Sequence, residues 1–483
     1  MWFPSTTWLL PLTLAGSAQV LAKGVKGAKG AKLGTTTSHV KKPGVTYKAF
    51  EHPATSVGVG YVNNSGICET TKGVNQYSGY LSVGENQNMF FWFFESRNNP
   101  DKAPLSAWFN GGPGCSSLAG LFEENGPCHF LNDGQDPSLN EYSWNNFANM
   151  LYIDQPIGVG FSYGNNDVNS TDTAAPYVWK FIQAFYDHFP RYESRDFGIF
   201  TQSYGGHYGP GFASYILEQN KAIEAGTVEG KKINLVALGI NNGMYDLELQ
   251  EKAHIAFAYS NPYKQLIDKP TRDKLLEAYK SECLPALQQC KQTQTDEDCL
   301  NAAVVCGEVV ETPILESSDF DVYDIRKPAS DPNAPRTFSN YLARPDVKKA
   351  IGASSNYVEC GYLPGQKFDG TGDLARSTMP ALSEVIQAGV NVLVWAGTAD
   401  FICNVDGSIA VADAVDFSGH NEFKAKALGP YKVNGKETGQ FKSVDNFHLL
   451  IVHNSGHEVP QYQPETALQV FNQILQKKPL SST

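Results

Sequence analysis

The chain has 483 residues, enough for one large domain or two of ordinary size. Hydrophobic residues make up 41% of it and charged residues only 18%, so a sizeable apolar core is available. A net charge of −12 and a pI near 5.4 argue against nucleic acid as a partner, because proteins that bind nucleic acids carry basic patches.

The N-terminus is typical of a secretory signal. Residues 8–22 form a mostly apolar run, shorter than the ~20 residues that a membrane-spanning helix needs, and small residues near its end offer cleavage sites. We expect a signal peptide over residues 1–22, with a buried N-terminal helix as the alternative. The protein is then secreted, either out of the cell or into a vacuole, and has no stable membrane association.

Residues 23–45 begin with lysines that alternate with glycine and alanine. A segment of this composition cannot bury enough surface to offset its ordering entropy. We expect a flexible pro-segment or linker here. A basic patch that attracts membranes is the alternative.

Nine cysteines agree with secretion, since disulfides persist in oxidising compartments. Four of them lie in residues 283–306 with spacings of 7, 9 and 7 residues, whereas paired zinc ligands are about two to four residues apart. We therefore expect disulfides rather than zinc, no metal and no cofactor, and at least one thiol left over because the count is odd. Asn63 and Asn169 each begin an Asn-X-Ser/Thr sequence and are candidate glycosylation sites.

Short apolar runs alternate with helical patterns along the chain, which favours a sheet covered by helices. Strands are expected at residues 89–94, 105–109, 149–153, 197–200, 391–395 and 447–452. Helices are expected at residues 174–189 and 209–225, and from residue 464 onward, where apolar positions repeat at helical spacing.

Between residues 246 and 365 the strand signals thin out, and the cysteine cluster lies in this stretch. We interpret residues 246–365 as a helical, disulfide-rich cap inserted into a core made of residues 46–245 and 366–483. A separate domain is less favoured, because no linker rich in Pro, Gly or Ser flanks the stretch on both sides.

A candidate nucleophile, Ser203, stands between a predicted strand and a predicted helix. A nucleophilic serine needs a sharp strand-to-helix turn with small neighbours, which Gly205 and Gly206 supply on one side. Thr201 takes the place of the first glycine of the G-x-S-x-G pattern, so an ordinary turn is the alternative.

Residues 108–117, with the sequence WFNGGPGCSS, overlap the end of an early predicted strand, where enzymes with a nucleophilic serine on a strand-to-helix turn place the loop that binds the oxyanion. Glycines let backbone N–H groups point into a site without a Cβ in the way. A phosphate-binding loop is the alternative, but no Gly-Lys-Ser/Thr follows.

Two histidines, His453 and His457, come just after the last predicted strand, where a general base belongs. Their spacing also allows metal ligands on one helix, but the Asn-Ser-Gly between them makes a helix improbable, and we prefer His457 as the base. His207 is interpreted as a packed core residue. Asp400 follows its strand directly and can orient His457, so the order along the chain is Ser203, Asp400, His457.

Taken together, these motifs resemble the serine carboxypeptidase family over residues 50–478. The matching blocks are residues 94–97, 108–117, 154–163, 203–207, 397–404 and 456–460. The resemblance implies an α/β-hydrolase fold with a mostly parallel central sheet flanked by helices. It also implies release of C-terminal amino acids from peptides and proteins through an acyl-enzyme intermediate, at acidic pH.

The resemblance assigns roles to further residues. The backbone N–H groups of Gly112 and Tyr204 match the oxyanion hole, and the substrate's terminal carboxylate is read by residues that match Trp108, Asn110, Glu124 and Gln202. The family has a glutamate where this chain has Gln202. An amide donates hydrogen bonds at any pH, whereas a carboxyl donates only when protonated, so we expect activity on peptides to extend further toward neutral pH.

The resemblance also implies a pairing of the cysteines. The implied disulfides are Cys283–Cys306, Cys290–Cys299, Cys115–Cys360 and Cys68–Cys128, with Cys403 as a buried free thiol. Two other functions are open. One is an esterase or acyltransferase on the same scaffold, which would not need a carboxylate reader, and the other is a binding protein without catalysis.

Overall fold

The structure is a computed structural model that describes residues 37–42, 45–51, 58–130, 135–329 and 337–483. The expected signal peptide and most of the expected pro-segment lie outside the described residues. Within the described part of the chain, no helix combines the length and the apolarity needed to cross a membrane.

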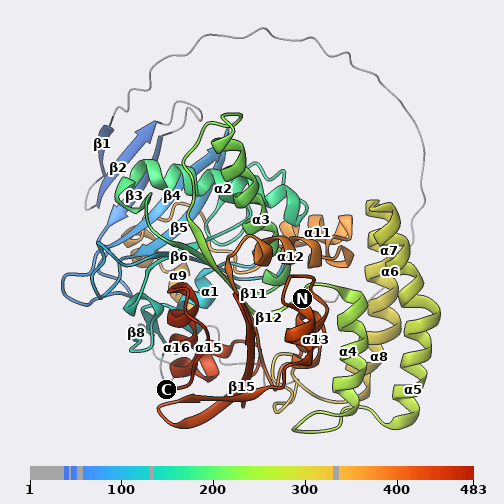
Figure 1. Cartoon of the computed structure of the whole chain (residues 1–483). Coiled ribbons are helices and arrows are strands. Elements are labelled where there is room, and N and C mark those ends of the chain that lie inside the picture. Colours follow the sequence, from blue (N-terminus) through green and yellow to red (C-terminus); the bar gives the residue numbers. More distant parts are fainter. Residues whose placement is uncertain (1–36, 43–44, 52–57, 131–134, 330–336) are drawn as a thin grey trace, which may run out of the picture.

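Six parallel strands form the centre of one large sheet (Figure 1). In their order across the sheet they are β9 (Asn149–Ile153), β6 (Leu105–Phe109), β11 (Phe197–Ser203), β12 (Leu235–Gly243), β13 (Asn391–Gly397) and β16 (Phe447–Val452). These strands are buried almost throughout, as expected for a parallel sheet with both faces covered. Because the strands are parallel, their carboxyl ends meet at one edge.

Antiparallel strands extend this centre on both sides. Beyond β9 lie β5 (Gln87–Phe94), β4 (Gln76–Gly84), β3 (Gly58–Asn63), β2 (Val45–Glu51) and β1 (Thr37–Lys42), and beyond β16 lie β15 (Lys436–Val444) and β14 (Gly429–Val433). The short β10 (Tyr163–Gly164) pairs with β5, and β7 (Cys128–His129) with β8 (Ser138–Leu139). The sheet is therefore mixed, with its parallel part at the centre.

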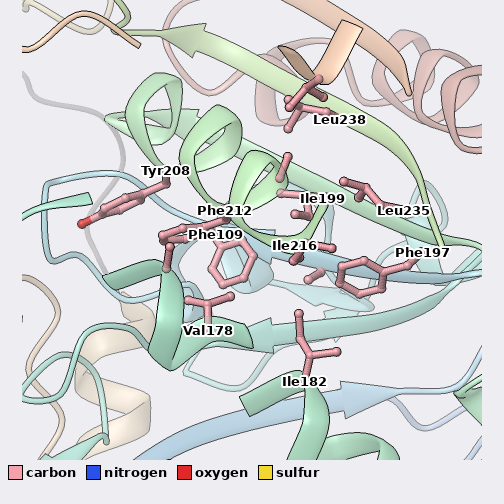
Figure 2. Close-up of a cluster of buried hydrophobic side chains, with 14 of the residues drawn as sticks. Phe109, Val178, Ile182, Phe197, Ile199, Tyr208, Phe212, Ile216, Leu235 and Leu238 are labelled. Atoms are coloured by element: carbon pink, nitrogen blue, oxygen red, sulfur yellow. The ribbon is translucent and has the colours of Figure 1, made fainter. Parts of the chain in front are cut away.

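Alternate side chains of the central strands pack into two separate hydrophobic layers, one on each face of the sheet. On one face, Phe109 and Ile199 pack with apolar residues of α2 (Thr171–His188) and α3 (Gly205–Glu224), as Figure 2 shows. On the other face, Trp108 and Phe200 belong to the layer that includes α16 (Pro464–Leu475). This alternation determines on which face of the sheet each side chain lies, including the side chains at the ends of the strands.

The described chain has further α-helices besides α2, α3 and α16. They are α1 (Leu118–Gly120), α4 (Leu247–Tyr259), α5 (Lys269–Ala278), α6 (Leu284–Thr293), α7 (Asp296–Cys306), α8 (Thr312–Ser317), α9 (Thr337–Ala343), α10 (Pro345–Ala350), α11 (Tyr362–Thr371), α12 (Met379–Gln387), α13 (Val405–Ala414), α14 (His420–Ala425) and α15 (Val459–Tyr462).

The stretch between β12 and β13 is helical, and its described part contributes no strand to the sheet. Helices α4 to α8 stand together beside the sheet (Figure 1) and share a hydrophobic cluster that also includes Ala396 of β13 and Ile451 of β16. Residues of α9 and α10 instead pack in the layer of Trp108. The segment between β12 and β13 thus contacts the core from two sides.

Four disulfides lie within the described residues. They join Cys68 to Cys128, Cys115 to Cys360, Cys283 to Cys306 and Cys290 to Cys299, which are the pairs that the resemblance implied. Since all four sulfurs of the 283–306 cluster are bonded in pairs, the zinc alternative for that cluster is wrong. Cys403 is buried and unpaired.

Candidate active site

Ser203 is the last residue of β11, and only Tyr204 separates it from α3. Its φ of 63° falls in the left-handed region, which a non-glycine residue adopts only when the surroundings force it, at a cost of about 1–3 kcal/mol. Helix α3 follows without room for larger residues, because a Cβ on Gly206 would lie 2.2 Å from the carbonyl oxygen of Met244. The strand therefore turns sharply into the helix and presents Ser203 at the carboxyl edge of the sheet.

The glycine-rich loop after β6 lies directly against this turn. A Cβ on Gly111 would stand 2.4 Å from the backbone nitrogen of Tyr204, so only glycine permits this approach. Gly112 has a φ of 117°, which L side chains rarely adopt. The hydroxyl of Tyr208 accepts a hydrogen bond of 3.0 Å from the N–H of Gly114 and holds the loop to α3. The loop that carries Gly111 and Gly112 thus lies against Tyr204 and Ser203.

A buried carboxylate fixes the far end of the loop. Asp154 accepts hydrogen bonds from the hydroxyl of Ser116 (2.5 Å) and from the N–H of Phe161 (3.0 Å). Burial raises the pKa of Asp154 to about 7, although these hydrogen bonds lower it. The Cys115–Cys360 disulfide ties the same loop to the residues before α11.

Asp400 and His457 form a buried pair beyond β13 and β16. Oδ2 of Asp400 lies 2.8 Å from Nδ1 of His457, and it also accepts from Nδ2 of Asn242 (2.7 Å) and from the N–H of Cys403 (3.2 Å). Burial lowers the pKa of His457, but the charge of Asp400 and its hydrogen bond outweigh burial and raise that pKa above its ordinary value. A carboxylate in this position fixes the ring and leaves Nε2 as the reactive nitrogen.

The backbone of His457 is anchored on three sides. Its N–H donates to the carbonyl oxygen of Tyr323 (2.9 Å), and its carbonyl oxygen accepts from Nδ2 of Asn241 (2.6 Å) and from Nε2 of Gln202 (3.3 Å). Gln202 precedes Ser203 in β11, and Asn241 is its pairing partner in the neighbouring strand β12. These contacts place His457 against the end of the strand that carries Ser203.

The four residues expected to read a carboxylate form one hydrogen-bonded chain. Nε1 of Trp108 donates to Oδ1 of Asn110 (2.7 Å), Nδ2 of Asn110 donates to Oε1 of Gln202 (3.0 Å), and Nε2 of Gln202 donates to Oε2 of Glu124 (3.3 Å). All four side chains are buried. Burial, followed by the charges of Glu458 and Glu123, raises the pKa of Glu124 well above its ordinary value, and a hydrogen bond with Asn110 lowers it.

Cys403 lies next to the Asp400–His457 pair. Its sulfur is less than 4.8 Å from the facing ligand atoms of Asp400 and His457. Burial and the charge of Asp400 raise the pKa of this thiol well above its usual range, whereas a hydrogen bond with Ser203 lowers it. The thiol is therefore neutral and is a poor nucleophile.

Two neighbouring asparagines of β12, Asn241 and Asn242, are site residues that the sequence reasoning missed. One holds the backbone of His457 and the other holds Asp400. Their only signal in the sequence is an Asn-Asn-Gly at the end of an apolar run. The run itself was not among the predicted strands.

The two other histidines weighed as candidates lie elsewhere. His207 is buried, with its ring nitrogens 2.7 Å and 3.0 Å from the carbonyl oxygens of Met244 and Arg376. His453 hydrogen-bonds through its backbone to Thr438.

Of the two candidate glycosylation sites, Asn63 is exposed and Asn169 is half-buried.

Comparison with known proteins places this geometry in context. A family profile described as serine carboxypeptidase matches residues 67–477. Carboxypeptidase S1 of Penicillium janthinellum is 66% identical over 423 residues, covering 88% of this chain and 100% of that protein. Carboxypeptidase Y of Schizosaccharomyces pombe is 38% identical over 410 residues, covering 83% of this chain and 41% of that protein.

A solved structure agrees in fold. The chain superposes on Kex1(delta)p of Saccharomyces cerevisiae, described as a prohormone-processing carboxypeptidase, with a TM-score of 0.73 and 23% identity. The match covers 85% of this chain and 93% of that one. The expected α/β-hydrolase fold is confirmed.

Proposed function

The chain belongs to the serine carboxypeptidase family and is a carboxypeptidase, and we propose that Ser203, His457 and Asp400 carry its reaction. The observation that carries this proposal is the convergence of β11, β13 and β16 at one sheet edge, with Asp400 bonded to Nδ1 of His457. The left-handed φ of Ser203 supports the role of nucleophile, because such strain gathers at active sites.

In the proposed reaction, Oγ of Ser203 bonds to the carbonyl carbon of the last peptide bond while its proton passes to Nε2 of His457. His457 then gives this proton to the leaving amine, the C–N bond breaks, and the last residue departs. Water attacks the acyl-enzyme in the same way, with His457 as base, and Ser203 regains its proton. Backbone N–H groups of Gly112 and Tyr204 stabilise the oxyanion, each at a typical worth of about 3 kcal/mol.

Recognition of a free C-terminus is assigned to Trp108, Asn110, Glu124 and Gln202. In support, the four side chains are joined by hydrogen bonds and lie next to the proposed triad, since Gln202 also contacts His457. Glu124 donates to an anionic carboxylate only when it carries a proton, which its raised pKa favours. We therefore propose that peptides bind best on the acidic side of neutral pH.

We further propose the organisation expected from the sequence: a core of residues 46–245 and 366–483 with residues 246–365 as a cap. The helices that gather around the Cys283–Cys306 disulfide support this division. Four disulfides also support secretion, because they persist in oxidising compartments. The exposed Asn63 fits a glycan attachment site.

The proposal is tested by digesting peptides that differ only in a free or amidated C-terminus, with the products weighed by mass spectrometry. We expect single residues to leave the free peptides alone, and we expect Ser203→Ala to remove this activity. Equal cleavage of both peptide forms would contradict carboxylate recognition. Internal cleavage would contradict the exopeptidase reaction, and undiminished activity of Ser203→Ala would contradict the assigned nucleophile.

A further inference from the structure

A second buried group of ionisable side chains lies behind the proposed triad. Glu251 and His254 come from α4, and Glu311 ends the helical turn Gly307–Glu311. Nδ1 of His254 is 3.4 Å from Oε2 of Glu251 and 3.9 Å from Oε1 of Glu311. The side chains of Glu251 and His254 are each 1% exposed and that of Glu311 is 9% exposed, so solvent screens their electrostatic interactions only weakly.

The hydrogen bonds of His254 define its charge state. Its Nε2 is 3.0 Å from the carbonyl oxygen of Ile402, and a carbonyl oxygen can only accept, so Nε2 carries a hydrogen. Its Nδ1 faces two carboxyl groups. An imidazolium satisfies all of these contacts, whereas a neutral ring leaves Nδ1 as an acceptor opposite carboxylate oxygens.

The carbonyl that His254 holds belongs to the loop that carries Asp400. The same peptide unit joins Ile402 to Cys403, and the N–H of Cys403 donates to Oδ2 of Asp400. One peptide unit is therefore fixed at its oxygen by His254 and at its nitrogen by Asp400. The ring of Phe401 also packs on the imidazole, with 5.2 Å between ring centroids.

We propose that Glu251, His254 and Glu311 form a positioning cluster that holds the Asp400 loop in its working geometry. This inference rests on the proposed function, because it assumes that Asp400 orients the catalytic base. His254 fixes the peptide unit that presents an N–H to Asp400, and Glu251, the nearer of the two glutamates, keeps His254 charged. The three residues touch neither the substrate nor the reacting atoms.

The charges around the cluster make its action depend on pH. Burial lowers the pKa of His254, but its contacts with Glu251 and Glu311 raise it to about 9. Burial, then the charge of Glu251, raises the pKa of Glu311 to about 8. The charges of Asp400 and Glu311 both act on the buried thiol of Cys403. Above about pH 8 the cluster gains buried negative charge next to Asp400, so we expect kcat to fall there.

The matched test compares His254→Gln with His448→Gln. Both remove a fully buried imidazole, but His448 contacts Asn391 at the start of β13, at the opposite edge of the sheet. We expect His254→Gln to lower kcat on a peptide with a free C-terminus about tenfold, with KM unchanged. The fall of kcat above pH 8 should also move to higher pH in this variant, because Glu311 loses the neighbouring positive charge that lowers its pKa. Equal losses of kcat in the two variants, or a wild-type kcat profile in His254→Gln, would overturn the positioning role.

A second variant keeps the test decisive if His254→Gln does not fold. Glu311→Gln imitates the protonated carboxyl, so we expect it to keep wild-type kcat at pH 6 and to stay active at pH 9, where wild-type kcat falls. An unchanged alkaline fall would contradict the cluster. In NMR spectra, the downfield proton resonance of Nδ1–H in His457 should weaken or shift in His254→Gln and stay unchanged in the control His448→Gln.

Labelling of Ser203 with a fluorophosphonate separates this inference from the proposed function. A wild-type protein that neither reacts nor cleaves peptides would refute the proposed triad, and the positioning role with it. A reactive wild-type protein whose His254→Gln and Glu311→Gln variants behave identically to it would refute the positioning role alone.

Discussion

Gln202 stands at the centre of the proposed carboxylate site, where it contacts Asn110, Glu124 and the backbone of His457. Its amide offers a donor at every pH, so Glu124 is the one group in this chain of four that must be protonated to donate. The identity of residue 202 should therefore set how steeply peptide binding weakens as the pH rises.

Replacing Gln202 with glutamate tests this. We expect Gln202→Glu to leave the KM for a peptide within about twofold at pH 5, where both carboxyls hold protons, and to raise it roughly tenfold more than in the wild type by pH 7. Steady-state kinetics across this range measure the effect. Hydrolysis of an ester without a terminal carboxylate is the control, and its KM should not respond. Parallel KM profiles for the two proteins on the peptide would refute the role of the amide.

At this scale the sequence is informative where a residue type has a chemical task. Ser203, Asp400 and His457 were predicted from position and chain order, and the structure brings Asp400 and His457 into contact. Asn242 was not predicted, because its task depends on β12 lying between β11 and β13. An asparagine at the end of a strand has no distinct signature until its neighbours in the sheet are known.

At the scale of helices and strands, the turn from β11 into α3 requires glycine for a steric reason. A Cβ on Gly206 would meet backbone atoms of Met244, which cannot move aside as a flexible side chain can. A Cβ on Gly370, in the exposed part of α11, would meet nothing within 4 Å. The same substitution should therefore have opposite effects in these two helices.

We expect Gly206→Ala to lower the free energy of unfolding by about 1–3 kcal/mol and to reduce peptide cleavage, because the strain falls beside Ser203. Gly370→Ala should raise the free energy of unfolding by about 0.5–1 kcal/mol, because alanine loses less backbone entropy in a helix. Denaturant titration and kcat measure both effects. A neutral Gly206→Ala would show that the turn relaxes without cost.

The predicted elements agree best where burial is continuous. The strands expected at residues 105–109 and 447–452 match β6 and β16 to the residue, and the strand expected at 197–200 continues to Ser203 in β11. β12 was missed although it is buried throughout, because glycine and asparagine interrupt its apolar pattern. The flanking strands β14 and β15 were missed too, since their burial alternates and their pairing depends on β16.

Over the whole molecule, several buried groups favour the folded state at low pH. Asp154, Glu311 and His254 have pKa values raised to about 7, 8 and 9, so the folded chain binds more protons than the unfolded chain up to about pH 7 at Asp154, pH 8 at Glu311 and pH 9 at His254. Each group then reduces the free energy of unfolding as pH rises, by up to ~1.4 kcal/mol per pH unit. Burial lowers the pKa of His448 to about 4, and this opposite contribution is complete by about pH 6.5.

We therefore expect the melting temperature to fall between pH 6.5 and 9, by on the order of 5 °C, when measured by calorimetry at constant ionic strength. Asp154→Asn, which removes one of the titrating groups, should flatten the part of this decline near pH 7. A melting temperature that is constant or rising over the same range would contradict the assignment of these buried groups.

The way the sheet is assembled also sets when activity can begin during synthesis. The serine and its glycine-rich loop come from β11 and β6, but the histidine follows β16, which joins the sheet beside β13. Until that last parallel strand has left the ribosome and paired, the nascent polypeptide holds the proposed nucleophile without the proposed proton acceptor. With the proposed triad, the enzyme is therefore inactive while it is being translated, and other proteins of the cell are protected from it without an inhibitor.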